Sequence, residues 1–448
     1  MKNNWKKAAA LLGLGALLLG LTGCAQKKEP IELTVWTYYN GEQLGAFNEA
    51  VEAFNATEGK NNNITVSASS LGSVNDLEQN VMDALQGKVG AQKVPDIFSA
   101  YADTAYALDN MGRAADLSPY LTDKDKKEYI QNYLTEGDFK DDGSIKVFPV
   151  AKATELLVVN DTDWQKFAEA TGTSADEFAT IEGLTAMAQR YYEWTDSLTE
   201  EPNDGRALFG RDAMANYMII GAKQLGYDIF ETADGKTIVN LPRDVAKKLW
   251  DNYYVPYVKG FFASSGRFRS DDMKTGNVLA FVGSSAGCTF FPDHVTNGDG
   301  DSYDIEVKTY QAPKFEGGAD YAVQQGAGMV IINKSDAQVE AAARFLMVKI
   351  ENSSPSMKKG VGKSLNTAVQ TVKANTLYTT RAFETGTQAR KKLEYAMSDA
   401  AQADRAAVGK ALQGGATLEE ATAEFVSEER FDAWYTQLMN ELSEIVGQ

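Results

Sequence analysis

The stretch FVGSSAGC places Gly283, Ser285 and Gly287 at the spacing of the nucleophile elbow of a serine hydrolase. A serine hydroxyl is a weak nucleophile, so such an enzyme also needs a histidine base and an acid that orients it. The only histidine, His294, follows Ser285 by nine residues, whereas these hydrolases place their histidine far downstream, after the acid. An exported serine hydrolase therefore remains only a minor alternative. We favour a turn whose backbone N–H groups and hydroxyls face a ligand over a turn without function.

A second stretch, NGDGDSYD, has part of the spacing of a calcium-binding loop, with Asn297, Asp299 and Asp301 as its first ligands. Ser302 stands where that loop requires glycine, and Lys308 where it requires glutamate, so we interpret the stretch as a solvated turn. One histidine excludes a His-rich metal centre, and two cysteines give no sign of a zinc site or a disulfide scaffold. We expect neither a metal nor a cofactor.

The composition indicates a globular protein large enough for two domains. The 448 residues are 44% apolar and 24% charged, and their formal net charge is −18. Such an acidic surface argues against binding to nucleic acid or adhesion to anionic lipid. No Ser-, Gly- or Pro-rich linker separates the halves of the sequence. We therefore expect either domains that are closely joined or a chain that crosses between the domains more than once.

The N-terminus has the pattern of an export signal. Three lysines precede an uncharged apolar run, residues 8–21, which at 14 residues is too short to span a bilayer. The following LTGC resembles the lipobox of bacterial lipoproteins, which would make Cys24 the lipidated first residue of the mature chain. A plain signal peptide with a chance cysteine is the alternative. We interpret 1–23 as the signal and 24–30 as a tether.

Strands and amphipathic helices alternate after the tether. Residues 31–36, 64–69 and 95–100 are predicted strands, and 42–57 and 73–85 are helices with one apolar stripe each. This order is typical of a parallel sheet with helices on its faces, in which ligands sit beyond the carboxyl ends of the strands. Polar and aromatic residues occupy those ends.

The rest of the chain is richer in helix. Predicted helices cover 181–195, 213–226, 242–255, 337–350 and 430–446, while 277–281 and 326–333 are predicted strands.

Five stretches in this order resemble the extracellular solute-binding proteins of ABC importers, in particular the carbohydrate-type group that includes maltose- and glycerol-phosphate-binding proteins. They are LTVWTYYNGE (33–42), VPDIFSAYADTAYALDNMG (94–112), FPVAKATELLVVND (148–161), DDMKTGNVLAFVGSSAG (271–287) and VQQGAGMVIINKSDAQVEAAARFL (323–346).

The resemblance implies an α/β, two-lobe fold of the type II periplasmic-binding-protein kind, with a ligand cleft between lobes joined by a hinge of several crossings. We expect residues 31–150 and 284–350 in the first lobe, and 151–283 and 351–448 in the second. The implied protein is a lipid-anchored monomer outside the cytoplasm that binds a mono- or oligosaccharide by hinge closure, passes it to the permease subunits and catalyses nothing.

The ligand-binding residues that we predict carry polar or aromatic side chains at strand ends and crossings. Aromatic faces pack on the C–H surfaces of sugars, while amides and carboxylates pair with hydroxyls, which are costly to leave unpaired. On the first lobe and the crossing strand they are Tyr38, Tyr39, Asn40, Glu42, Tyr101, Asp103, Thr104, Thr154 and Glu155. On the second lobe and the returning strands they are Asp212, Asn216, Tyr217, Ser284, Ser285, Gln324 and Gln325. Core packing is the alternative for each tyrosine.

Two arginines near the returning segment, Arg267 and Arg269, have two possible roles. A bidentate clamp on a carboxylate or phosphate would suit a phosphorylated or acidic polyol as the ligand. We favour ion pairs with Asp271 and Asp272, and keep Arg269 among the candidate ligand-binding residues. Members of the family often carry a tryptophan in the turn that follows the returning strand, and this chain has none there, so the resemblance identifies no particular sugar.

Overall fold

The first lobe is built on strand β1 (Ile31–Thr37), in which buried Leu33 and Val35 alternate with exposed residues. The computed structural model describes residues 29–233, 236–298, 300–347 and 355–448; the signal and Cys24 lie outside them. Strand β1 pairs in parallel with β2 (Ile64–Ser70) and β3 (Ile97–Ala100), and β13 (Gly328–Ile331) joins β3 antiparallel. The sheet order is therefore β13-β3-β1-β2.

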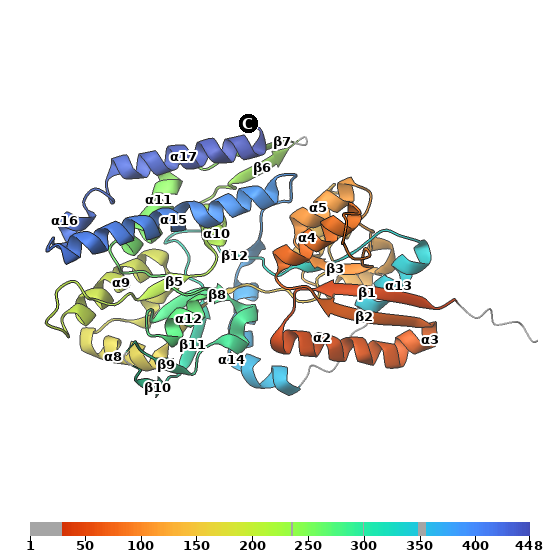
Figure 1. Cartoon of the computed structure of the whole chain (residues 1–448), viewed down its shortest axis with the longest axis horizontal. Helices are drawn as coiled ribbons and strands as arrows, with labels where there is room; N and C mark the ends of the chain where they lie inside the picture. Colours follow the sequence, from red (N-terminus) through yellow and green to blue (C-terminus); the bar gives the residue numbers. More distant parts are fainter. Residues whose placement is uncertain (1–28, 234–235, 299, 348–354) are drawn as a thin grey trace, which may run out of the picture.

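Helices cover both faces of this first sheet (Figure 1). On one face α2 (Gly41–Phe54) and α13 (Asp336–Met347) pack together, with the rings of Phe54 and Phe345 5.1 Å apart. On the other face α4 (Val74–Leu85) and α5 (Ala102–Asn110) contribute Leu77, Val81 and Leu108. Ser73 caps the start of α4 and forms a capping box with Asp76.

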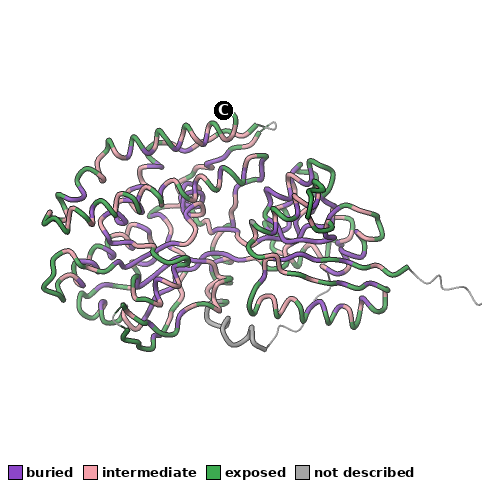
Figure 2. Tube along the Cα trace, in the orientation of Figure 1, coloured by how far each residue is buried: buried purple, intermediate pink, exposed green. Residues whose placement is uncertain are grey.

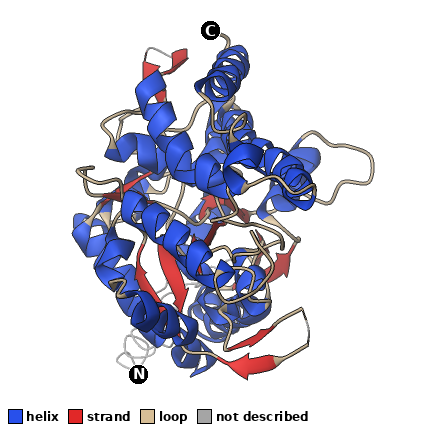
Figure 3. Ribbon diagram, turned by 90° about the vertical axis from the view of Figure 1, so that its left-hand side faces the viewer, coloured by secondary structure: helices blue, strands red, loops and turns tan. Residues whose placement is uncertain are grey.

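The second lobe contains a mixed sheet of order β11-β4-β8-β5. Every residue of β4 (Glu155–Asn160) is buried, as expected of a central strand covered on both faces. It lies antiparallel to β8 (Ala280–Ser284) and to β11 (Val307–Gln311), and β5 (Phe209–Arg211) pairs in parallel with β8. Buried strands run through the middle of the molecule in Figure 2, and Figure 3 shows helices around them.

Long helices enclose the second sheet. They are α8 (Asp161–Thr171), α9 (Ile181–Asp196), α10 (Met214–Gln224), α11 (Arg243–Val258), α14 (Pro355–Ala374), α15 (Gly386–Gln413) and α17 (Glu428–Val446). Their aromatic side chains dominate the core: Trp250 stacks on Tyr254 at a centroid distance of 3.5 Å and contacts Trp434 at 4.7 Å. Among the described residues, none of the helices is both long enough and apolar enough to cross a membrane.

Smaller elements complete the chain. They are α3 (Lys60–Asn62), α6 (Asp123–Lys126), α7 (Gln131–Leu134), α12 (Arg269–Lys274), α16 (Leu418–Thr422), β6 (Phe230–Ala233), β7 (Lys236–Val239), β9 (His294–Thr296), β10 (Ser302–Asp304), β12 (Tyr321–Val323) and β14 (Thr376–Tyr378).

The chain passes between the lobes in adjacent segments. Residues 148–154 lead from the first lobe to β4, and residues 312–327 lead back to β13. Bridges between Phe148 and Met329 and between Ala153 and Gln325 tie the two passes together, and β12 on the return pairs with β14. The two-lobe α/β fold and the hinge of more than one crossing are therefore confirmed.

One boundary differs from the prediction. We expected 284–350 in the first lobe, but β11 pairs along its whole length with β4 of the second sheet. The return to the first lobe thus begins after Gln311. The predicted strands and helices otherwise appear with ends shifted by a few residues; Met347 is the last residue of α13, and residues 348–350 of its predicted range lie outside the described part.

Candidate ligand-binding site between the lobes

A buried charged cluster lies where the crossing strand enters the second lobe. Glu155, the first residue of β4, accepts a hydrogen bond from Asn216 Nδ2 at 2.8 Å and forms an ion pair with Arg211, the last residue of β5. Both partners of the ion pair are less than a tenth exposed. The structure therefore brings together two predicted residues, Glu155 and Asn216, around Arg211, which we did not predict.

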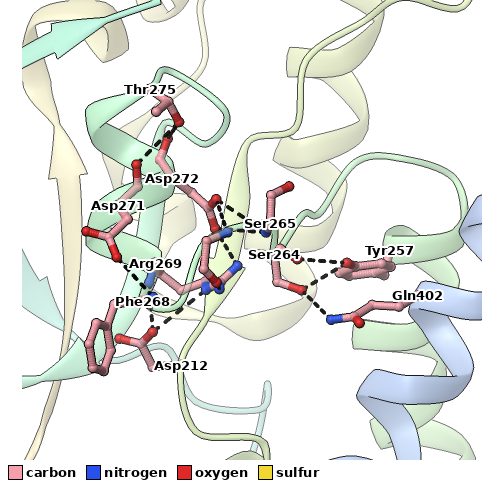
Figure 4. Close-up of polar contacts among 11 residues, drawn as sticks. Asp212, Tyr257, Ser264, Ser265, Phe268, Arg269, Asp271, Asp272, Thr275 and Gln402 are labelled. Carbon is pink, nitrogen blue, oxygen red and sulfur yellow. Dashed lines mark hydrogen bonds and ion pairs between the residues drawn. The ribbon is translucent and has the colours of Figure 1, made fainter.

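Asp212 and Arg269 form the next part of the cluster (Figure 4). The backbone N–H of Arg269 donates to Asp212 Oδ1 at 2.8 Å, and its Nε lies 3.7 Å from the same oxygen. The guanidinium pairs mainly with buried Asp272, which also accepts from the Gly266 N–H at 2.7 Å. Of the two predicted ion-pair partners, Asp272 is correct, whereas Asp271 instead accepts from the backbone N–H at the start of α12.

Arg269 is thus 5% exposed and neutralised by carboxylates, and the structure gives it a positioning role for Asp212. Arg267 is exposed and lies over the Phe268 ring, 5.2 Å from its centroid. The Arg269 guanidinium is thus committed to carboxylates of its own lobe.

Helix α15 adds a carboxylate that the sequence did not reveal. Glu394 Oε2 accepts from the Ala215 N–H at 2.8 Å, at the start of α10. Burial raises the pKa of Glu394, and the nearby charge of Glu155 raises it further; burial likewise raises the pKa of Asp212. Three carboxylates therefore share this end of the second lobe. No local pattern in α15 distinguishes Glu394 from solvent-facing glutamates.

The first lobe contributes the start of α5. Tyr101 precedes the helix and is 39% exposed, while Asp103 and Thr104 are buried. Asp103 Oδ2 accepts from Arg390 Nε of α15 at 2.8 Å, so this predicted residue bridges the two lobes. The backbone N–H of Tyr101 donates to Glu78 Oε1 at 3.2 Å, and burial raises the pKa of Glu78.

The four predicted residues after β1 have different surroundings. Tyr39 is 4% exposed and lies in the core of the first lobe, with its ring 5.4 Å from that of Phe47, because its side chain continues the inward alternation of the strand. Tyr38 is half-buried, whereas Asn40 and Glu42 are exposed at the start of α2. Of these four residues, Tyr38, Asn40 and Glu42 keep accessible surface for a ligand, and Tyr39 does not.

The returning turn lies against the crossing strand. Thr154 donates its backbone N–H to Ser285 Oγ at 3.2 Å and accepts from the Ser285 N–H at 2.8 Å. Ser284 lies opposite Glu155 in the sheet, and its hydroxyl accepts from the Ala286 N–H. His294 is in the exposed β9 hairpin, with its Nδ1 on Asp293. The hydroxyl of Ser285 thus accepts a hydrogen bond from the backbone of the crossing strand. The described contacts do not link it to the histidine.

The same turn reaches the first lobe and carries an aromatic ring that sequence reasoning missed. Gln43 Nε2 of α2 donates to Ala286 O at 3.4 Å. Phe290, at the end of the turn, is 51% exposed and lies beside Gly41, where an added Cβ would be 3.9 Å from its Cζ. Phe290 offers a stacking surface close to where the family often places a tryptophan.

Three further predicted residues make their hydrogen bonds within the second core or the hinge. Tyr217 is in the second core, where its hydroxyl donates to Leu249 O at 2.8 Å, although its ring lies beside Arg211. Gln324 Nε2 donates to Glu136 Oε2 at 3.1 Å, and Gln325 pairs through its backbone with Ala153. These glutamines belong to the hinge.

Two cavities flank the hinge. One of about 350 Å³ is lined by Glu155 and Arg211 together with return-strand residues such as Tyr321. The other, of about 600 Å³, lies between residues of both lobes, among them Glu136, Asp228 and the hinge residue Gln324. Polar groups of the second lobe and the hinge therefore border the smaller cavity, and polar groups of both lobes border the larger one. Among the described residues, no group of three or more His, Cys, Asp or Glu side chains has the arrangement of a metal site.

Solved structures with this fold bind small solutes. The chain is similar to the cyclic alpha-maltosyl-1,6-maltose binding protein from Arthrobacter globiformis, at 17% identity over 94% of this chain and 100% of that chain, with a TM-score of 0.61. It is also similar to UgpB from Mycobacterium tuberculosis in complex with glycerophosphocholine, at 16% identity over 94% of this chain and 99% of that chain, with a TM-score of 0.64. A third similar structure is the galacto-N-biose-/lacto-N-biose I-binding protein of the ABC transporter from Bifidobacterium longum, at 13% identity over 93% of this chain and 98% of that chain, with a TM-score of 0.63. These identities establish a shared fold.

Sequence comparison supplies the family. No curated protein sequence matches the chain. The model of the bacterial extracellular solute-binding protein family, however, matches residues 49–364, which include the crossings and parts of both lobes. Since that match covers well over half of the chain, the protein belongs to the bacterial extracellular solute-binding proteins, which bind their solutes and do not transform them.

Proposed function

We propose that the protein captures a carbohydrate between its lobes and delivers it to the permease of an ABC importer. The observation that carries this proposal is a set of buried polar atoms near the hinge without hydrogen-bond partners among the described residues: Asp103 Oδ1, Arg211 Nε and Thr154 Oγ1. An unpaired buried polar atom costs about 1–3 kcal/mol. Sugar hydroxyls both donate and accept, so they would satisfy a carboxylate, a guanidinium and a hydroxyl alike.

Exposed aromatic surface on both lobes supports the same ligand class. Phe290 and Tyr101 are among the large hydrophobic side chains that remain exposed, one from each lobe. Ring faces combined with a few fixed polar groups are typical of small-molecule sites. Two similar structures carry the names of oligosaccharide-binding proteins, which supports a carbohydrate here as well.

A phosphorylated polyol is the second candidate, and the similarity to UgpB favours it. The arginines weaken it, because Arg269 pairs with Asp272 and Arg211 pairs with Glu155. A phosphate would have to displace one of these carboxylates.

Hinge closure is the proposed mode of capture. Asp103 and Gln43 of the first lobe already contact Arg390 and the 284–290 turn of the second. A ligand that touches both lobes makes its full set of contacts only in the closed state and so selects that state. We further propose that Cys24 carries the lipid that keeps the protein at the outer face of the membrane.

A thermal-shift screen tests the ligand class. The panel contains mono-, di- and oligosaccharides, sugar acids and glycerol phosphates, since a ligand that binds only the folded state raises the melting temperature. We expect a shift with a neutral sugar. A shift confined to glycerol phosphates would support the second candidate, and no shift with any sugar would refute carbohydrate binding. Small-angle scattering with the best ligand should show a smaller radius of gyration; an unchanged radius would refute closure.

A further inference from the structure

The second lobe contains a polar cavity that the interlobe site does not use. Its volume is about 440 Å³, and its lining includes Arg206, Ser264, Ser265, Asn277 and Arg405. These residues come from the loop before β5, the loop after α11, the turn after α12, and α15. Among the described residues, the lining contains none that we assign to the interlobe site and no aspartate or glutamate. Two carboxylates contact the lining from outside it: Asp196 and Asp272 accept from the backbone N–H groups of the lining residues Gly205 and Ser265 at 3.2 Å.

Arg405 is a partly buried cation without a carboxylate partner among the described residues. Its Nη1 donates to the carbonyl of Val258 at 3.3 Å. Its neighbour Asp404 pairs instead with Arg430, whose Nη2 lies 2.7 Å away, and with the Tyr254 hydroxyl. Burial lowers the pKa of the Arg405 guanidinium, and its hydrogen bond to the Tyr192 side chain offsets this only in part.

Gly260 creates the space for this guanidinium. A Cβ added at Gly260 would lie 2.5 Å from Arg405 Nη2, and the φ of the glycine is +86°. The left-handed backbone therefore favours glycine at this position, and a larger residue would also have to displace the guanidinium. The fold of the chain thus holds Arg405 at the cavity wall.

Arg206 supplies a second guanidinium. Its backbone N–H donates to Thr195 Oγ1 at 2.8 Å, but its exposed side chain forms no ion pair within the described part of the chain. Hydroxyls also line the cavity: Ser264 Oγ is 2.9 Å from the Tyr257 hydroxyl and accepts from Gln402 Nε2 at 3.2 Å (Figure 4). The cavity therefore offers two positive charges and several neutral hydrogen-bonding groups.

We propose that this cavity is a binding site for a small organic anion, with Arg405 and Arg206 binding its carboxylate or phosphate group. Planar guanidinium groups pair with both kinds of oxyanion through two parallel hydrogen bonds. A volume of about 440 Å³ leaves room for a small organic molecule in addition to the charged group. The site is separate from the carbohydrate site and does not depend on it.

Isothermal titration calorimetry of the full chain with citrate and with glycerol 3-phosphate tests the proposal and distinguishes the two sources of oxyanion. We expect at least one to bind, and Arg405→Gln and Arg206→Gln each to weaken it by about tenfold or more. Arg405→Lys keeps the charge but not the planar fork, so its loss should be intermediate. The control is Arg113→Gln, which removes an exposed arginine of the first lobe.

The proposal fails if neither anion binds the wild-type chain. It also fails if Arg113→Gln weakens binding as much as the cavity variants do, because the effect would then reflect net charge alone. Arg206 is exposed, so Arg206→Gln should fold even where Arg405→Gln does not, and unchanged binding by folded Arg206→Gln would refute the two-arginine site.

Discussion

Asp103 of α5 and Arg390 of α15 form an ion pair across the two lobes, with Oδ2 and Nε 2.8 Å apart. Gly386 makes this approach possible, because a Cβ on it would lie 2.3 Å from Asp103 Oδ1. Arg390 also donates to the carbonyl of Thr380 at 3.1 Å, in the segment that joins β14 to α15. The pair therefore couples α5 both to the second lobe and to the hinge.

Removing this charge should loosen the contact between the lobes. Asp103→Asn leaves Arg390 without its partner, and we expect the free energy of unfolding to fall by about 1–3 kcal/mol. This is less than the roughly 3–5 kcal/mol of a fully buried pair, because the Arg390 side chain is 25% exposed. We also expect a larger radius of gyration. Urea unfolding and small-angle scattering measure the two effects, with Asp123→Asn on exposed α6 as the control. Wild-type values for both would contradict an interlobe role.

Phe290→Ala should weaken carbohydrate binding without destabilising the fold. The ring is half exposed, so its removal costs little in the free protein, whereas a bound sugar would lose its apolar contact. A loss of about tenfold in affinity corresponds to burial of about half of such a ring. Calorimetry with a ligand from the screen measures it. Phe290→Trp should retain binding; if the alanine variant binds as tightly as the wild type, the ring does not contact the ligand.

Glu394 predicts a pH dependence of stability. Burial raises its pKa above the ordinary value of 4.5, so the folded state holds this proton more tightly than the unfolded state does. Between pH 4.5 and that higher pKa, stability therefore falls as the pH rises. Glu394→Gln cannot ionise and keeps an oxygen for the Ala215 N–H, so its stability should fall less over this range. Urea unfolding from about pH 4.5 to about pH 7.5 provides the measurement. Identical pH profiles would show that Glu394 is not perturbed.

Ser285→Ala should remove a hydrogen bond and no reaction. The hydroxyl accepts from the Thr154 N–H, so we expect a loss of about 1 kcal/mol in the free energy of unfolding. A fluorophosphonate reagent should label neither the wild type nor the variant. Labelling of the folded wild type that disappears in Ser285→Ala would indicate a reactive serine.

The anchor is tested at the N-terminus. Cys24→Ala should prevent attachment of lipid and release the protein from the membrane fraction of expressing cells. Fractionation with and without detergent measures this, and mass spectrometry of the mature N-terminus identifies the modification. A variant that still needs detergent for its release would contradict the lipoprotein interpretation.

Much of the fold could be predicted because the burial of one face of a helix or strand leaves a local pattern. Strand β1 and helix α4 show that pattern clearly. Strand β11 does not, because its residues are only partly buried or exposed at the edge of the sheet, and its assignment to the wrong lobe followed.

The site was less predictable because its contacts join distant residues. Arg211 and Glu155 are 56 positions apart, and Arg390 and Asp103 are 287 apart, so neither pairing has a local signature. The sequence did point to Glu155, as a polar residue of the crossing strand, and to Asp212, just before the predicted helix 213–226. Tyr39, predicted as a ligand contact at the end of a strand, was misplaced because one more residue of inward alternation carried its side chain into the core.

The pairing of β13 with β3 has a consequence for the order in which the protein can be made. Met329 lies opposite Ser99 although 230 positions separate them, and the whole second sheet is encoded between them. A chain that emerges N-terminus first must therefore wait with an unfinished first sheet, its β3 edge unpaired, until the second sheet has been synthesised. Such an edge readily pairs with other chains. Fragments that end before residue 328 should be aggregation-prone. Chaperones that shield strand edges would matter most in the interval between the synthesis of β3 and that of β13.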